Sequence, residues 1–282
     1  MNEQKQYLEG LLERTALYFD KSDLSKVASL TVAIAGFGGV GAITAELLAR
    51  WGVSNFRLLD KDIYEPSNLN RQVFSTSRTI GRYKVEVAEE RIKEINPFAK
   101  VEMSFAESVR NENIHRFIKG ADIVIQTADH PSCKLFYLAA REHKVPLVNG
   151  HATLTGGRVQ TFDYRVSPCS SVLDSWWNRI KFGNSKSLLE MTSEELAAFD
   201  EKYVHPTAPS VNFVTNMVGC LIVAEAVKLL TGKGKVILYP RYLEFDVFTF
   251  KMKTPSSRSI LNPKNFKTTW NVIKKTKLAS KP

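Results

Sequence analysis

The sequence predicts an α/β fold built on a doubly wound, mostly parallel sheet that antiparallel strands extend in the C-terminal half. Over the first 150 residues, short apolar runs alternate with helical segments at the spacing of βαβ units. A glycine-rich turn follows the first apolar run and opens a helix. After residue 151 this alternation stops, and the later apolar segments have the period-two pattern of antiparallel strands.

The N-terminal half supplies most of the elements. Leucines spaced along one face predict a helix within residues 5–20. Apolar runs bounded by glycine or charged residues predict strands at 30–36, 56–62, 101–105, 121–129 and 145–150. Amphipathic segments between them predict helices at 42–52, 82–95 and 131–143.

The C-terminal half is less regular. Period-two patterning predicts strands within 156–166 and 235–252, with an irregular stretch from Ser167 to about Glu190 after the first. Thr192 and Glu195 have the spacing of a capping box, which predicts the start of a short helix. A long apolar helix follows over about 210–230, and Gly232 is suited to end it.

Composition limits the partners and the compartment. The chain has 282 residues and a formal net charge of +10, which fits either a solvated basic surface or a polyanionic partner such as ATP, RNA or an acidic peptide. The N-terminus lacks the pattern of a signal peptide, and polar residues interrupt the apolar segment 206–224. We therefore expect a cytoplasmic protein in which that segment is a buried helix and not a membrane span.

The glycine turn is the first sign of a nucleotide site. Gly36, Gly38, Gly39 and Gly41 follow a strand and open a helix, where unpaired N–H groups favour phosphate. Asp60 closes the next strand, and a carboxylate there accepts hydrogen bonds from ribose hydroxyls. These features fit an NAD-dependent dehydrogenase and an ATP-using enzyme equally well.

The residues that follow favour a triphosphate. Asn68, Arg71 and Gln72 lie just past the second strand, and Lys84 begins the next helix. Two cations here exceed what a pyrophosphate needs but suit ATP. Asp129, at the end of the strand 121–129, is placed at the carboxyl edge where such sheets bind ligands, and a lone carboxylate there suits Mg²⁺.

Together these motifs resemble the ThiF/MoeB/HesA superfamily, relatives of the ubiquitin-activating enzymes. The resemblance spans about residues 14–252 and is carried by the following segments: GFGGVG at 36–41, LLDKD at 58–62, SNLNRQ at 67–72, GRYKVEVAEERIKEINP at 81–97, TAD at 127–129, GCLIVAEAVKLLTG at 219–232 and YLEFD at 242–246.

The resemblance implies a Rossmann-like adenylyltransferase that works as a homodimer. In such an enzyme a substrate carboxylate attacks the α-phosphate of ATP, which gives an acyl-adenylate and pyrophosphate. Asp60 would bind ribose, Asn68, Arg71 and Lys84 the triphosphate, and Asp129 Mg²⁺, with Asp62 and Gln72 beside them. Arg14 matches an arginine that the family lends to the partner subunit's site.

The resemblance also implies a division of the chain. Residues 1–252 would form one adenylyltransferase domain, with a nucleotide-binding half at about 28–150 and a substrate and dimer half at about 151–252. Residues 253–282 would form a basic C-terminal tail.

The cysteines depart from the pattern of many superfamily members. Those members hold a structural zinc with two CxxC pairs, whereas here Cys169 stands alone, so we expect no structural zinc. The loop before the long helix has no cysteine for acyl transfer, which leaves Cys169 as the candidate nucleophile. We expect Cys133 and Cys220 to be buried thiols.

Trp176 and Trp177 lie in the irregular stretch after residue 167. They fit either contact with a substrate or packing over the edge of the core.

Several functions remain open at this point. The first is adenylation of a carboxylate, at the C-terminus or on a side chain, of a small ubiquitin-like protein or peptide. A variant of the same chemistry acts on a tRNA nucleoside carboxylate, which the positive charge suits. An NAD(P)-dependent oxidoreductase would use the glycine turn and Asp60, but would leave Arg71, Lys84 and Asp129 without a role. A third class of function is a scaffold without catalytic activity that binds a partner.

Overall fold

One mixed sheet organises the chain. The structure is a computed structural model that describes residues 3–169, 187–203 and 209–257. In these residues the strands are β1 (Thr31–Ala35), β2 (Asn55–Leu59), β3 (Lys100–Phe105), β4 (Ile123–Gln126), β5 (Leu147–Ala152), β6 (Gly156–Phe162), β7 (Leu243–Asp246) and β8 (Lys251–Lys253).

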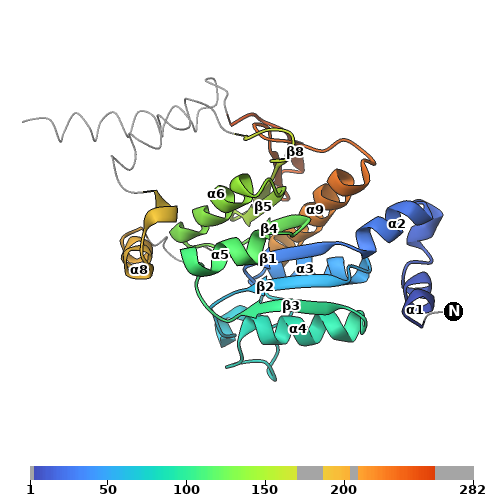
Figure 1. Cartoon of the computed structure of the whole chain (residues 1–282), viewed down its shortest axis with the longest axis horizontal. Helices are drawn as coiled ribbons and strands as arrows, with labels where there is room; N and C mark the ends of the chain where they lie inside the picture. The colour runs from blue at the N-terminus through green and yellow to red at the C-terminus, as the bar shows by residue number, and fades with distance from the viewer. Residues whose placement is uncertain (1–2, 170–186, 204–208, 258–282) are drawn as a thin grey trace, which may run out of the picture.

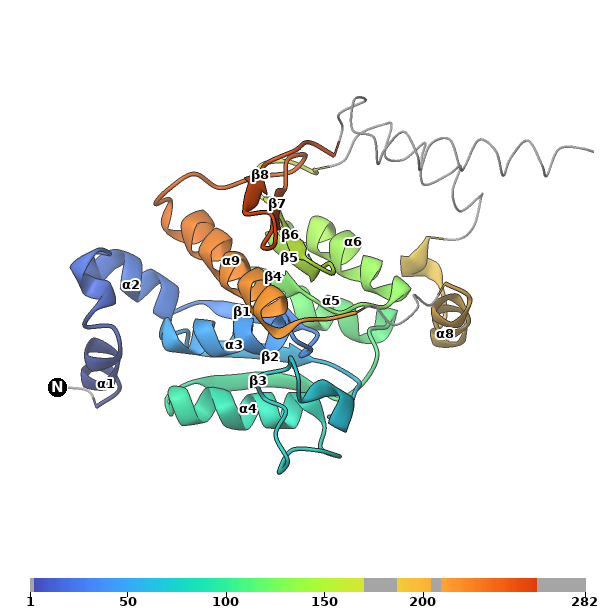
Figure 2. The same ribbon diagram turned by 180° about the vertical axis from the view of Figure 1, so that it is seen from behind.

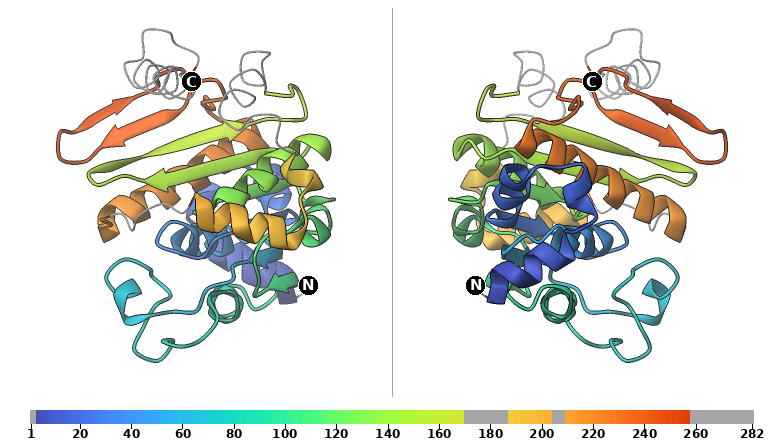
Figure 3. Two further views of the ribbon diagram at one scale, coloured as in Figure 1. Left: turned by 90° about the vertical axis from the view of Figure 1, so that its left-hand side faces the viewer. Right: turned by 90° about the vertical axis from the view of Figure 1, so that its right-hand side faces the viewer.

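The strand order confirms the predicted fold class. The sheet runs β3-β2-β1-β4-β5-β6-β7-β8, with β1 to β5 parallel and each later strand antiparallel to its neighbour. The β7–β8 hairpin forms one edge of the sheet (Figure 3). Because β1 lies between β2 and β4, the order reverses at β1, and ligands of doubly wound sheets bind at such a reversal.

Helices cover both faces of the sheet, as Figures 1 and 2 show from opposite sides. The described helices are α1 (Glu3–Leu11), η1 (Thr15–Leu17), α2 (Lys21–Ala28), α3 (Gly41–Arg50), η2 (Pro66–Asn68), α4 (Lys84–Ile95), α5 (Asn111–Ile118), η3 (Pro131–Cys133), α6 (Lys134–Glu142), η4 (Leu188–Glu190), α8 (Ser193–Lys202) and α9 (Asn212–Thr231). Apolar side chains of α3, α4 and α9 form one core with the sheet, and those of α5 and α6 form a second core on the other face.

The helix ends follow the predicted chemistry. The Thr192 hydroxyl accepts a hydrogen bond from the Glu195 N–H, and the Glu195 carboxylate accepts one from the Thr192 N–H. Gly232 ends α9 in the left-handed conformation, with φ of 74°. The predicted helix within 5–20 is instead α1 followed by the short helix η1. Trp176, Trp177 and the tail from residue 258 lie outside the described residues.

Two glycines, which have no side chain, let α9 pack closely against its neighbours. A Cβ atom on Gly219 would lie 2.3 Å from Ile43 Cγ2 of α3, and one on Gly157 of β6 would lie 2.3 Å from Val218 Cγ2. The helix is long and apolar enough to pass for a membrane span by length and composition, yet 56% of its most apolar window is buried within the fold. Cys220 lies on the exposed side of α9, so the expectation that this thiol is buried is wrong.

Candidate functional site

An open cleft lies where β1, β2 and β4 end, and its empty space of about 640 Å³ includes the part that is open to solvent. The segments that follow these strands bring Gly36, Asp60 and Thr127 to its wall. The expected edge of the sheet therefore carries a cavity.

The glycine turn has little room for side chains. Gly36 has φ of +87°, and a Cβ atom there would lie 2.6 Å from the Ala128 backbone nitrogen. A Cβ atom on Gly41 would lie 1.8 Å from the Gly36 carbonyl oxygen. These two glycines therefore let β1 turn into α3 directly beside the segment that follows β4.

Gly38 differs from these two because nothing in the protein crowds it. It lines the cleft, and the nearest heavy atom to a Cβ there would be Gln72 Nε2, at 3.9 Å. The missing side chain therefore leaves space on the cleft side. No side chain caps the first turn of α3. This helix N-terminus is suited to an anion, because its N–H groups and its dipole both favour negative charge.

Asp60 and Lys84 form the charged wall of the cleft. Asp60 is buried and accepts hydrogen bonds from the backbone N–H groups of Phe37, at 2.5 Å, and Asp62, at 2.9 Å. Burial raises the pKa of the Asp60 carboxyl, and the nearby Lys84 ammonium partly offsets this increase. Lys84 is also buried, with its Nζ 3.1 Å from the Asp62 carboxylate.

Asp129 and Asp200 are two further carboxylates of the cleft wall, and Glu107, which pairs with Arg110, is a third. Asp200 of α8 accepts hydrogen bonds from both the backbone N–H and the hydroxyl of Ser132, at 2.7 Å each. Asp129 lies three residues beyond the end of β4, is exposed, and has no ion-pair partner among the described residues. Because Mg²⁺ prefers oxygen ligands and takes few of them from protein, the free Asp129 carboxylate fits this ion better than the engaged Asp200.

The cleft gathers only part of the predicted site. Gly36, Gly38, Asp60, Asp62, Lys84 and Asp129 line it. Gly39 does not, because it packs beside Thr215 of α9, and Gly41 serves the turn.

Three predicted residues lie in the loop between β2 and α4, outside the cleft lining. Asn68 caps η2 by accepting a hydrogen bond from the Glu65 N–H. The Arg71 guanidinium donates to the Ser67 carbonyl at 2.7 Å and to the Asn70 side chain at 2.9 Å. The Gln72 Oε1 is buried and unpaired among the described residues, and the amide of that side chain lies near Gly38.

Arg14 lies far from the cleft of its own chain. Leu12, two residues earlier, packs beside Gly52, where a Cβ atom would lie 3.3 Å from Leu12 Cδ1. Gly52 follows the C-terminal end of α3, whereas the cleft is at its N-terminal end. A helix of this length spans about 15 Å. Figures 1 and 2 also place α1 and α8 at opposite ends of the molecule, and Asp200 of α8 lines the cleft.

Neither Cys133 nor Cys169 has the environment of an activated thiol. Burial raises the pKa of Cys133 to about 12, although this residue lines the cleft at the start of α6. Burial also raises the pKa of Cys169, which is half-buried. A thiol becomes a strong nucleophile when its pKa is lowered, so both environments oppose that chemistry.

Sequence reasoning missed other cleft residues, among them Glu107, Ser108, His130 and Asp200. Glu107 and Ser108 follow the end of β3, and His130 follows Asp129. All three could have been predicted, because the carboxyl ends of parallel strands meet at one edge of the sheet. Asp200 carries no such signal, because it reaches Ser132 across 68 positions of the chain.

Comparisons with known proteins agree with the fold. Residues 12–265 match the ThiF family. The chain is 28% identical over 241 residues to the SAMP-activating enzyme E1 of Haloferax volcanii, covering 83% of this chain and 79% of that protein. It is 34% identical over 138 residues to the tRNA threonylcarbamoyladenosine dehydratase of Bacillus subtilis, covering 48% of this chain and 54% of that protein.

Further relatives are named adenylyltransferases, and the chain spans about half of one of them, at 53%. Among solved structures, E. coli MccB with MccA-N7isoASN has a TM-score of 0.69 at 18% identity, with coverage of 91% of this chain and 75% of that one. This likeness concerns the fold alone. The family match extends over most of the chain and includes both halves of the sheet, so the chain belongs to the ThiF family.

Proposed function

We propose that this protein is an ATP-dependent adenylyltransferase that activates a carboxylate as an acyl-adenylate and releases pyrophosphate. The main observation in support is the cleft at the reversal of strand order, where a glycine turn, a buried lysine and a free carboxylate meet. Family membership supports the same chemistry, since relatives are named adenylyltransferases.

The proposed reaction assigns each charged group a task. A carboxylate oxygen of the substrate attacks the α-phosphorus of ATP, and the bond to the bridging oxygen breaks, so that pyrophosphate leaves with the electron pair. Asp60 would hold the ribose and Lys84 the triphosphate, with Asn68, Arg71 and Gln72 reaching it from the neighbouring loop. Asp129 would hold Mg²⁺, which neutralises phosphate charge.

We propose that the site is completed by a second copy of the chain. Arg14 lies near the end of α3 that is remote from the cleft, so it does not serve the cleft of its own chain. In a homodimer, Arg14 of one protomer would face the triphosphate in its partner and stabilise the charge on the leaving pyrophosphate. This assignment rests on the family resemblance together with the position of the residue.

We propose a small protein or a peptide as the source of the carboxylate. One relative is named for activating SAMP, and the similar MccB structure contains a MccA peptide variant. The raised pKa of Cys169 supports a reaction that ends at the adenylate, with the next nucleophile supplied by another molecule.

A tRNA nucleoside carboxylate is the second candidate. The net charge of +10 and the relative named for a tRNA nucleoside favour it. The two substrates separate in one assay: AMP transfer from labelled ATP to peptides with a free C-terminal carboxylate, to the same peptides as amides, and to bulk tRNA. Label on the free acids alone supports a peptide substrate, and label on tRNA alone supports the second candidate.

Calorimetry with Mg·ATP and with NAD⁺ tests the nucleotide assignment itself. We expect Mg·ATP to bind and NAD⁺ to bind far more weakly, because the cleft offers a buried cation and a free carboxylate. Tight binding of NAD⁺ without binding of ATP would overturn the adenylyltransferase proposal in favour of an oxidoreductase.

A further inference from the structure

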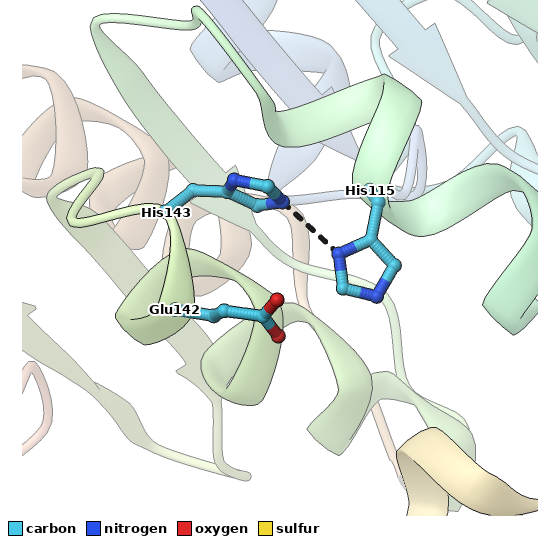
Figure 4. Close-up of side chains that lie close together, drawn as sticks. All are labelled: His115, Glu142 and His143. Atoms are coloured by element: carbon cyan, nitrogen blue, oxygen red, sulfur yellow. Dashed lines mark hydrogen bonds between the residues drawn. The ribbon is translucent and has the colours of Figure 1, made fainter.

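Three potential metal ligands lie together, on α5 and at the C-terminal end of α6 (Figure 4). His115 Nδ1 lies 3.0 Å from His143 Nε2, and the Glu142 carboxylate lies beside the two rings. One ligand atom from each residue falls within 4.8 Å of the other two. Both histidines are half-buried and Glu142 is exposed, so an ion from solution can reach the group.

The spacing of the two nitrogens suits a single metal ion. Two nitrogens bound at about 2.1 Å lie roughly 3.0–3.4 Å apart when they occupy neighbouring positions of octahedral or tetrahedral coordination. The observed 3.0 Å is at the short end of this interval. Glu142 ends α6, and its exposed side chain is free to turn toward the two nitrogens as the third ligand.

The packing of the two helices fixes this spacing. Phe117 of α5 and Phe136 of α6 are fully buried, with ring centroids 6.0 Å apart. His115 lies two positions before Phe117 on α5, and His143 is the cap residue that ends α6. The core therefore fixes the relative position of the two helix ends that carry the histidines.

The helix dipoles at the group favour a cation. His115 lies in the last turn of α5 and His143 ends α6, so the negative ends of two helix dipoles are close to the proposed ion. Three cations adjacent in sequence oppose this effect, namely Arg116, Arg141 and Lys144. The Arg116 guanidinium lies 5.5 Å from the Phe105 ring centroid, and that of Arg141 lies 5.7 Å from the Tyr164 ring centroid.

We propose that His115, His143 and Glu142 bind one divalent late transition-metal ion, such as Ni²⁺ or Zn²⁺, with water in the remaining positions. The ion replaces the hydrogen bond between the imidazoles and ties α5 to α6. Imidazole and carboxylate ligands suit these metals, whereas Mg²⁺ prefers oxygen alone.

This site is separate from the nucleotide cleft and from a cysteine-bound zinc. The cleft meets α6 at its N-terminal end, through Ser132 and Cys133, while the proposed ion lies at the opposite end of the same helix. None of its ligands is a cysteine, so it does not depend on the CxxC pairs that the sequence lacks. The proposal also stands apart from the adenylyltransferase assignment, because its test uses metal binding alone.

The test is a calorimetric titration of untagged, chelator-treated protein with Ni²⁺ in excess Mg²⁺, which fills sites made only of oxygen ligands. We expect one Ni²⁺ per chain for the wild type. His115→Ala and His143→Ala should each weaken binding by at least about tenfold, and Glu142→Gln by several-fold. His151→Ala removes an exposed histidine of β5 and should leave the affinity unchanged.

Thermal unfolding with and without Ni²⁺ gives an independent readout. The wild-type Tm should rise with Ni²⁺ concentration, because the ion binds the folded state, and the rise should vanish in His115→Ala. Glu142→Gln leaves both imidazoles in place, so it keeps the test valid if a histidine variant folds poorly. Absence of Ni²⁺ binding by the wild type, or wild-type affinity in both histidine variants, overturns the proposal.

Discussion

At the scale of single residues, Lys84 is the cation that the cleft holds most firmly. Its side chain is 7% exposed, and its Nζ lies 3.1 Å from the Asp62 carboxylate and 5.9 Å from the Tyr64 ring centroid. A buried ammonium costs free energy unless it is paired, and Asp62 supplies that pairing while remaining 47% exposed toward the cleft. Lys84 is therefore placed to meet a polyanion.

Lys84→Met should weaken Mg·ATP binding with a modest effect on folding. The loss of one charged contact to phosphate is worth about 1.5–3 kcal/mol, which corresponds to a rise in Kd of roughly 10- to 150-fold. Arg82→Met is the matched control, because Arg82 pairs with Glu90 at 2.6 Å and is not among the residues that line the cleft. Calorimetry on both variants checks this, and an equal loss in the two would argue against a specific role for Lys84.

Gly36→Ala should destabilise the fold and abolish nucleotide binding. Alanine at φ of +87° is strained, and its Cβ atom would lie 2.6 Å from backbone that cannot move away easily. The two effects together cost about 2–5 kcal/mol. Gly232→Ala has the strain without the overlap, since φ is +74° and nothing lies within 4 Å. Urea unfolding should show the smaller loss for Gly232→Ala, and equal losses would contradict the overlap argument.

At the scale of elements, the sequence predicted the parallel strands β1 to β5, because buried parallel strands read as apolar runs, and it predicted the helices α3, α4 and α6 from their amphipathic patterns. It did not predict α2 or α5. The same reasoning predicted Asp60 and Asp129, which follow strand ends. It was wrong about Cys220 because α9 carries apolar residues on every side of the helix. The spacing of these residues therefore does not show which side is buried. It also missed the contact of His115 with His143, which depends on the packing of two helices.

The contact of α3 with α9 gives a prediction at this scale. Gly219→Ala should lower the free energy of unfolding by about 1–2 kcal/mol, because overlap with Ile43 costs more than the helix propensity of alanine returns. Gly10→Ala on α1 has nothing within 4 Å and should be neutral or slightly stabilising. Urea unfolding of both variants checks this. A Gly219→Ala chain as stable as Gly10→Ala would show that the contact is loose.

At the scale of the whole molecule, α1 and α8 lie at opposite ends of the protein (Figures 1 and 2). Arg14 follows α1 closely, whereas Asp200 of α8 lines the cleft. If the arginine acts on ATP, it acts in the partner subunit, and each active site then combines residues of two chains. Defects in different chains can consequently complement each other.

Mixing Arg14→Ala with Asp129→Ala chains should restore activity that neither variant has alone. Random exchange makes about half of the dimers mixed, and each mixed dimer has one intact site, so about a quarter of the wild-type activity should return. Pyrophosphate exchange measured before and after mixing checks this. If the subunits exchange and activity stays absent, Arg14 does not act across the interface.

The most direct test of the central claim is carboxylate-dependent exchange of labelled pyrophosphate into ATP by the wild type and by Asp129→Ala. We expect exchange by the wild type only with a substrate that has a free carboxylate, and loss of exchange in Asp129→Ala even at saturating Mg²⁺. Asp122→Ala, an exposed carboxylate at the other end of β4, should keep exchange. Wild-type exchange in a folded Asp129→Ala chain would show that Asp129 does not hold the Mg²⁺ of the reaction.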